Sequence, residues 1–328
     1  MQGVEMSRGQ RREFQGGSDP VHEPVLSREV ADLLAGPGSA LRAASDEARD
    51  GWWIDATLGA GGHAGHLLEA LPHVRLLGID QDPEILDIAR VRLAAFGERA
   101  TLECARISQL EDVAGSHAVG RVLGILLDLG ASSLQLDRPE RGFSFQIDGP
   151  LDMRMDPTRE RTAADILNTW DESDLADLFY YEGGESRSRR IARAVTEARR
   201  RAPFQRTQAL VALVERCLGP RRSKLHSATR VFQALRRAVN EEGEELLAGL
   251  ALAERRLAEG GRLAVISFHS GEDGVVKRFV ACGVREGRWK PLTKKPIRAG
   301  QAEARLNRRA RSASLRAAER TTFEEQGR

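Results

Sequence analysis

Short apolar runs recur about every 25 residues in the first part of the chain and alternate with helix-like segments. The runs cover residues 52–55, 74–80, 100–104 and 121–128. Between them lie helix-like segments at 64–71 and 83–96, the second opening on Pro83, and a shorter one near Ser108. Such alternation is typical of a doubly wound parallel sheet, so the sequence predicts an α/β fold.

After Asp128 the alternation stops, and residues 163–240 show helical periodicity only. One predicted helix face carries Leu210, Leu213, Val214, Cys217 and Leu218. Thr169 and Glu172 have the spacing of a capping box, which predicts a helix start there.

The apolar pattern of a strand returns near the C-terminal end. A helix is predicted over 241–259, ended by Gly260 and Gly261, and residues 263–267 form another apolar run. The simplest architecture is therefore a sheet domain interrupted by an all-helical insertion.

The segment 128–156, DLGASSLQLDRPERGFSFQIDGPLDMRMD, has no period of 2 or of 3.6 residues and predicts neither an ordinary strand nor an amphipathic helix. A loop of this length in a compact domain is usually disordered or part of a site. Its apolar residues, among them Phe143, Phe145 and Leu151, are too numerous for a solvated linker. We therefore expect this segment to help form the site.

With 41% hydrophobic and 30% charged residues, the composition is that of a soluble globular protein. The 328 residues suffice for a full domain and a second, smaller one. The sequence lacks an apolar run that would cross a bilayer and its polar start lacks the core of a secretory signal, so a cytoplasmic location is expected. Cys104, Cys217 and Cys282 lie far apart without metal-ligand spacing and are expected to be reduced thiols.

A net charge of +2 conceals a strong segregation. Residues 185–240 carry 15 Lys and Arg against 3 Asp and Glu, and residues 285–328 carry 13 against 5. Concentrated positive charge on an otherwise acidic protein indicates a partner with a phosphate backbone. The alternative is that these charges only solvate helix faces and a basic tail.

A glycine-rich turn, DATLGAGGH at 55–63, follows the first predicted strand and leads into a helix. Glycines there let the backbone approach a ligand, and Asp80, twenty-one residues after Gly59, is placed to accept hydrogen bonds from ribose hydroxyls. The glycine spacing alone also fits a dinucleotide dehydrogenase.

Three acids distinguish between a dinucleotide and a cationic adenosine cofactor as the ligand of this turn. Asp55, Asp80 and Asp128 each close a predicted strand, and together they would repel a pyrophosphate. They suit a cationic adenosine cofactor such as S-adenosylmethionine. A metal site at His63 and His66 is not favoured, because no third ligand has suitable spacing; His63 is expected to cap or pack beside the cofactor loop.

Several stretches together resemble the RsmH (MraW) family of 16S ribosomal RNA cytosine-N4 methyltransferases. They are residues 22–26, the glycine turn, 78–83, the segment 128–156, 190–193, 228–235, 267–270 and 309–312. The resemblance implies a class I (Rossmann-like) methyltransferase sheet, residues 22–138 and 240–328, with an inserted helical substrate-recognition domain over 139–239 after a flexible arm of residues 1–21. It places the S-adenosylmethionine contacts at Gly61, Gly62, His63, Asp80, Asp128 and Gln135, and Ile107 where the family usually has an aromatic residue.

The implied reaction transfers a methyl group to the exocyclic N4 of a decoding-region cytosine in 16S rRNA, presented on the small ribosomal subunit. An amine needs no cysteine nucleophile, and none of the cysteines lies beside a proline. The candidates for the proton acceptor are Asp128, Ser132, Ser133, Ser267 and His269.

Other interpretations stay open at this point. Phe143 and Phe145 either stack on an extruded base or close the core between domains. The whole chain is alternatively an NAD-dependent oxidoreductase with a Rossmann loop, or a non-catalytic RNA-binding protein that retains a nucleotide pocket.

Overall fold

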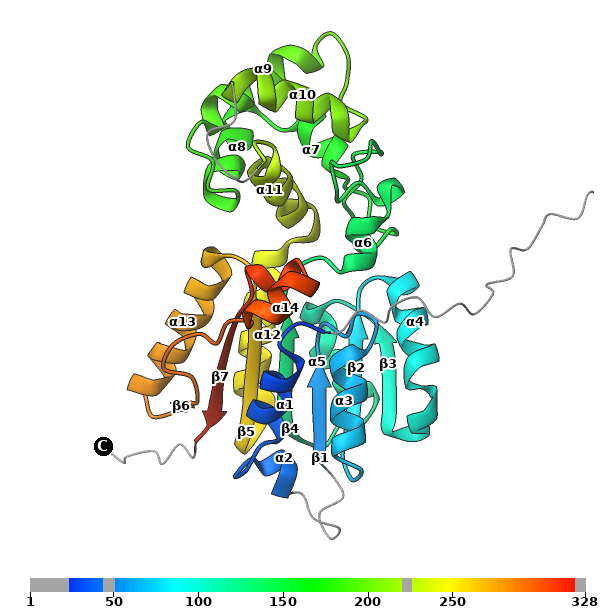
Figure 1. The fold of residues 1–328 in the computed structure, drawn as a ribbon, viewed down its shortest axis with the longest axis vertical. Helices are drawn as coiled ribbons and strands as arrows, with labels where there is room; N and C mark the ends of the chain where they lie inside the picture. Colours follow the sequence, from blue (N-terminus) through cyan, green and yellow to red (C-terminus); the bar gives the residue numbers. More distant parts are fainter. Residues whose placement is uncertain (1–23, 44–50, 220–225, 322–328) are drawn as a thin grey trace, which may run out of the picture.

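In the computed structural model, residues 24–43, 51–219 and 226–321 are described. They form a sheet lobe and, beyond the tips of its central strands, a helical lobe (Figure 1). The arm predicted for residues 1–21 lies outside the described residues. Among those described, no helix has the length and apolar content needed to span a membrane.

Within the described residues the sheet has seven strands in the order β3-β2-β1-β4-β5-β7-β6. The strands are β1 Gly51–Asp55, β2 Arg75–Asp80, β3 Ala100–Cys104, β4 Arg121–Asp128, β5 Leu257–Ser267, β6 Trp289–Pro291 and β7 Ser314–Arg320. The first five run parallel, and β7 is antiparallel to both of its neighbours. The predicted doubly wound α/β sheet is confirmed. Its strand order reverses between β1 and β4, where open α/β sheets place their ligands at the carboxyl ends of the strands.

Helices cover both faces of this sheet, because its strands are apolar on both sides. One face packs against α1 Ser27–Ala35, α3 Gly62–Ala70 and α4 Pro83–Leu93. The other packs against α5 Leu110–Ser116, α12 Glu242–Arg256 and α13 Ser270–Arg285. In β1 the adjacent residues Trp53 and Ile54 point into these opposite cores.

The helical lobe is inserted between β4 and β5 (Figure 1). The short helix α6 Ser133–Asp137 leads into it, and its helices are α7 Ala163–Thr169, α8 Glu172–Asp177, α9 Ser188–Arg199, α10 Thr207–Leu218 and α11 Thr229–Asn240. A hydrophobic core of its own gathers buried side chains from Ala131 to Val239. Leu210, Leu213, Val214 and Cys217 of α10 lie in this core, as their helical spacing predicts.

Three local expectations are wrong. The capping box is made by Thr162 and Asp165 at the start of α7, whereas Thr169 ends that helix and Asp171 precedes α8. The helix predicted to reach 259 ends at Arg256, because Leu257 already pairs with Val122 of β4. As a result, Gly260 and Gly261 lie inside β5.

Two buried polar side chains hold the segment 128–156 in place. Asp82 caps α4 and accepts hydrogen bonds from Gln135 Nε2 and Arg141 Nη2, both at 2.8 Å. Asn240, at the end of α11, accepts the Met155 amide at 2.8 Å and donates to the Met153 carbonyl at 2.8 Å. The segment is thereby tied to the sheet lobe at one point and to the helical lobe at another.

Replacing Asn240 by alanine should lower the free energy of unfolding by about 2–4 kcal/mol, because it leaves two buried backbone groups without partners. Chemical denaturation followed by circular dichroism measures this loss. Gln301→Ala, at an exposed helix position, is the control and should change little. An equally stable Asn240→Ala protein would contradict the role given to this side chain.

Candidate active site

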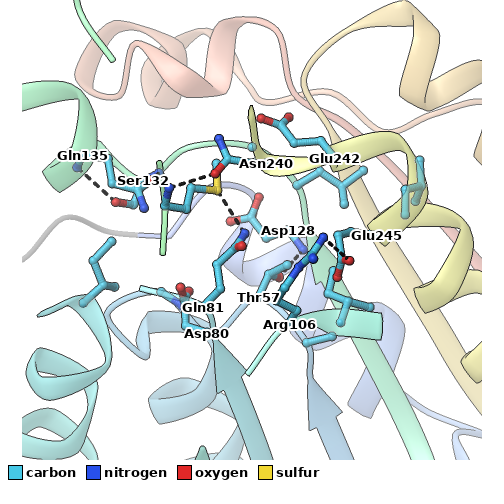
Figure 2. A pocket seen from close by; sticks show the side chains of 18 of the residues that line it. Thr57, Asp80, Gln81, Arg106, Asp128, Ser132, Gln135, Asn240, Glu242 and Glu245 are labelled. Carbon is cyan, nitrogen blue, oxygen red and sulfur yellow. Dashed lines mark hydrogen bonds and ion pairs between the residues drawn. The ribbon is translucent and has the colours of Figure 1, made fainter. Parts of the chain in front are cut away.

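A cavity opens where β1, β2 and β4 end beneath the junction of α11 and α12 (Figure 2). The strand ends contribute Thr57, Asp80 and Asp128 to its wall. The other labelled residues come from the loops after β2 and β3, from the segment after β4 and from the α11–α12 junction: Gln81, Arg106, Ser132, Gln135, Asn240, Glu242 and Glu245. The cavity therefore lies at the switch point of the sheet, with part of its wall supplied by the helical lobe.

Asp80 organises the glycine turn. Its Oδ2 accepts the Gly59 amide at 2.9 Å, and its Oδ1 accepts the Asp82 amide at 2.9 Å. Burial raises the pKa of Asp80 to about 6 in spite of these hydrogen bonds. Each oxygen keeps a second lone pair, so the carboxylate can also accept the hydroxyls of a ribose.

Asp55 and Asp128 add two further buried carboxyls. Burial raises the pKa of Asp55 to about 8, and both other strand-end acids add to this through charge repulsion. Burial likewise raises the pKa of Asp128 to about 6, although the guanidinium of Arg309 opposes the rise. Asp128 lines the cavity, whereas Asp55 does not.

The surroundings of Asp128 fit a cationic ligand. Its Oδ1 accepts no hydrogen bond from the described residues, and its Oδ2 lies 3.9 Å from Nε2 of His63. Burial lowers the pKa of His63 to about 3, so this ring is neutral and brings no compensating charge. Arg309 comes no closer than 3.8 Å. A buried carboxylate with so little compensation favours an incoming cation.

The remaining acids of the wall already have partners. Glu245 pairs with Arg106 at 2.7 Å, and Glu242 is bound by two nitrogens of Arg236 at 2.7 and 2.8 Å. Glu272 of α13 accepts the Phe268 amide at 3.0 Å. Although burial opposes the shift, the pKa of Glu272 is lowered by its contact with His269, by the charge of Arg236 and by the Phe268 amide. Asp128 is thus the incompletely compensated carboxylate.

Three of the six predicted cofactor contacts, Asp80, Asp128 and Gln135, line the cavity, and His63 touches Asp128. Gly61 and Gly62 lie outside the wall. Both are closely packed: a Cβ on Gly61, whose φ of +75° already favours glycine, would come 3.1 Å from Leu93, and one on Gly62 would come 3.1 Å from Pro24. The cofactor contacts predicted for them stay predictions. Gln135 is committed to the protein through Asp82 and the Ser132 amide.

Part of the cavity wall is apolar. The apolar residues of its wall include Ala105, Ile107 and Leu246, which pack in one core cluster, and Ile85 of α4. This surface suits the flat face of an adenine, which would pack on Ile107 without aromatic stacking. Together with Asp80 and Asp128, it gives the cavity an apolar wall, a ribose acceptor and an anionic wall, the set that an S-adenosylmethionine molecule needs.

The proton-acceptor candidates separate on position. Asp128 and Ser132 line the cavity, whereas Ser133, Ser267 and His269 do not. Nδ1 of His269 caps α13 instead, at 3.2 Å from the Gly271 amide.

The two aromatic candidates for base stacking belong to the helical lobe. Phe143 is buried in its core, and Phe145 packs edge-on against Phe232 with ring centres 5.0 Å apart.

Among the wall residues that sequence reasoning missed are Glu272 and Arg309. Arg309 lies inside the stretch 309–312 that carries part of the family resemblance, which was a usable signal. Glu272 lies outside every stretch that carries the resemblance, so it gave none.

Comparison with known proteins decides the family. The sequence model of the MraW methylase family matches residues 19–321. The chain belongs to the MraW methylase family. Relatives named "Ribosomal RNA small subunit methyltransferase H" include one from Beijerinckia indica, 43% identical over 99% of this chain and 92% of the relative. One from Cereibacter sphaeroides is 49% identical over 92% and 90%, and one from Sorangium cellulosum is 48% identical over 91% and 90%.

Among solved structures, a putative rRNA methylase from Clostridium thermocellum aligns with a TM-score of 0.40 and 12% identity, over 86% of this chain and 97% of that one. The family membership makes this MraW-family methylase an S-adenosyl-L-methionine-dependent methyltransferase and sets the oxidoreductase alternative aside. Within its described residues, no cluster of three or more His, Cys, Asp or Glu side chains is arranged to hold a metal ion.

Substituting Asp128 by asparagine should weaken S-adenosylmethionine binding about 10- to 100-fold, because the cation loses its anionic partner. Without cofactor, the same protein should be at least as stable as the wild type near neutral pH, since an ionised carboxyl with a raised pKa costs folding free energy. Calorimetry and thermal melting measure the two effects. Asp137→Asn, at an exposed position of α6, is the control. Unchanged affinity in Asp128→Asn would remove Asp128 from the site.

Cofactor affinity should fall as the pH falls through about 6, because Asp80 and Asp128 then hold protons and no longer attract a cation. Below that pH, each carboxyl that must lose its proton before the cofactor binds lowers the affinity by up to about tenfold per pH unit. The raised pKa values also mean that the free protein loses unfolding free energy as the pH rises from 3.8 through about 6. Titration calorimetry over this pH range measures how cofactor affinity changes with pH. The change should be smaller in Asp128→Asn than in the wild type. Affinity independent of pH would contradict it.

Proposed function

We propose that this methylase transfers a methyl group from S-adenosyl-L-methionine to the exocyclic N4 of a decoding-region cytosine in 16S rRNA of the small ribosomal subunit. The observation that carries the proposal is the incompletely compensated Asp128 in a cavity that opens beside a basic helical lobe. The names of the relatives support ribosomal RNA of the small subunit as the substrate. The choice of N4 and of the decoding region rests on the family resemblance.

The residues of the cavity divide the work. Bound S-adenosylmethionine supplies an electrophilic methyl group on a sulfonium. Asp80 would hold the ribose, the wall around Ile107 would pack on the adenine, and Asp128 would hold the cationic end. Fixing both reactants in line contributes about 7–11 kcal/mol in well-oriented systems.

The amine proton requires an acceptor near the methyl group. Asp128 and Ser132 are the acceptor candidates on the wall, and the pKa of Asp128, raised to about 6 by burial, lies near the value that suits a general base at neutral pH. Oγ of Ser132 accepts the Gln135 amide at 3.2 Å and retains a further lone pair. Either oxygen would favour the tetrahedral form of the amine by accepting its hydrogen.

We assign RNA recognition to the inserted helical domain, residues 139–239, and methyl transfer to residues 22–138 and 240–328. The outer face of α9 carries Arg189, Arg190 and Arg193, all exposed and, among the described residues, without a carboxylate partner. By contrast, Arg236 and Arg237 of α11 are held by Glu242 and Glu182. These three arginines thus lie on one exposed face of α9, where phosphates can reach them. A substrate of this kind places the protein in the cytoplasm.

Incubation with labelled S-adenosylmethionine and undermethylated small ribosomal subunits, followed by nucleoside analysis, tests the reaction. We expect label in N4-methylated cytidine. Binding of subunits without transfer would favour the non-catalytic alternative, and label on another nucleoside would refute the choice of N4.

Replacing Arg189, Arg190 and Arg193 by glutamate should weaken subunit binding. The slope of log affinity against log salt concentration should become shallower, by up to about the amount that three phosphate contacts contribute. Filter binding across a range of salt concentrations measures the slope. A matched control reverses Lys277, Arg278 and Arg285, which are exposed on α13, and makes the same change in net charge. Equal slopes in the two triple variants would contradict an RNA-binding role specific to α9, and thermal melting verifies that both fold.

A further inference from the structure

Arg309 is a cation of the cavity wall that no carboxylate of the described residues holds by a hydrogen bond. It opens the short helical turn η5 Arg309–Arg311, in which Ala310 is buried. Its guanidinium lies over the ring of Phe268, 4.7 Å from the ring centre. The backbone of Arg309 is therefore anchored and its planar head is supported, while its donors stay uncommitted.

The contact with Asp128 is electrostatic only. Nη2 of Arg309 lies 3.8 Å from Oδ1 of Asp128, beyond hydrogen-bond distance, and that oxygen is buried without a donor among the described residues. Both side chains keep some exposure, 21% for the arginine and 14% for the aspartate. Such a pair can separate without breaking a hydrogen bond.

Other arginines around the cavity are fixed. Arg106 donates to Glu241 and contacts Glu245, each at 2.7 Å. Arg236 forms a two-bond pair with Glu242. Releasing Arg106 would leave the buried Glu245 without its ion-pair partner, and releasing Arg236 would leave the largely buried Glu242 without both of its bonds. Of the two arginines in this wall, Arg309 is the one that can change partners without breaking a hydrogen bond to a carboxylate.

We propose that Arg309 is a positioning residue that exchanges one anion for another. Before the cofactor binds it compensates Asp128, and once the cofactor's cation lies beside Asp128 it binds a phosphate of the RNA. The inference rests on the proposed function and adds a named residue to it.

Charge explains the exchange. Two cations at one carboxylate repel each other, so the cofactor's cation frees the guanidinium. A free guanidinium presents a planar fork of donors that matches a phosphate, and Phe268 keeps that plane in place. Cofactor binding should therefore strengthen RNA binding, and RNA should strengthen cofactor binding by the same factor.

The test measures the binding of undermethylated small ribosomal subunits with and without sinefungin, a non-transferable analogue of the cofactor that carries an amine in place of the sulfonium. For the wild type, sinefungin should tighten subunit binding on the order of tenfold. Arg309→Gln should still bind sinefungin but lose this tightening. Arg309→Lys keeps the charge without the planar fork and should show a smaller effect. Arg308→Gln, an exposed neighbour, is the matched control and should behave as the wild type.

Equal tightening in the wild type and Arg309→Gln would overturn the inference, as would a wild type whose subunit binding ignores sinefungin. These outcomes leave the proposed function intact, because subunits still bind. A wild type that binds no subunits at all would instead refute the proposed function and, with it, the inference. Thermal melting of each variant separates a lost contact from a lost fold.

Discussion

Ionised carboxylates are costly to bury, and this protein places three acids at the tips of the central strands β1, β2 and β4. Asp55, Asp80 and Asp128 all have raised pKa values, with burial as the largest cause. Most other acids near the cavity have an arginine or a hydrogen-bond donor within 3 Å. Asp128 has neither, so its negative charge is incompletely compensated in the protein without cofactor. A cationic methyl donor bound beside Asp128 would supply the missing positive charge.

The rest of the fold holds Asp128 and the cavity wall around it in position. The segment 128–156 is long and irregular, but Asp82 fixes it at Gln135 and Arg141, and Asn240 fixes it near its end at Met155. The same bonds hold the helical lobe beside the carboxyl edge of the sheet (Figure 1). The negative pocket and the positive α9 surface thus belong to different lobes of one chain, which suits a cationic cofactor below and a polyanionic substrate above.

Much of this arrangement could be predicted from local patterns. The alternation of apolar runs and helices predicted β1 to β4, and the acids that close those strands predicted the anionic wall. The ligand contacts interpreted at Gly61 and Gly62 stay predictions, and the close packing of these glycines against Leu93 and Pro24 is a feature that no local pattern reveals. The short β6 gave too little periodicity to recognise. Arg309 and Glu272 reach the cavity from more than 140 residues beyond Asp128, so only the tertiary fold brings them to it.

The central claim is that the strand-end acids form the place where the methyl donor binds. A crystal structure of the protein with S-adenosyl-L-methionine tests it most directly. The account predicts adenine against Ile107 and Leu246, the ribose on Asp80, and the cationic end beside Asp128. A donor bound elsewhere, with Asp128 still facing only His63 and Arg309, would contradict it.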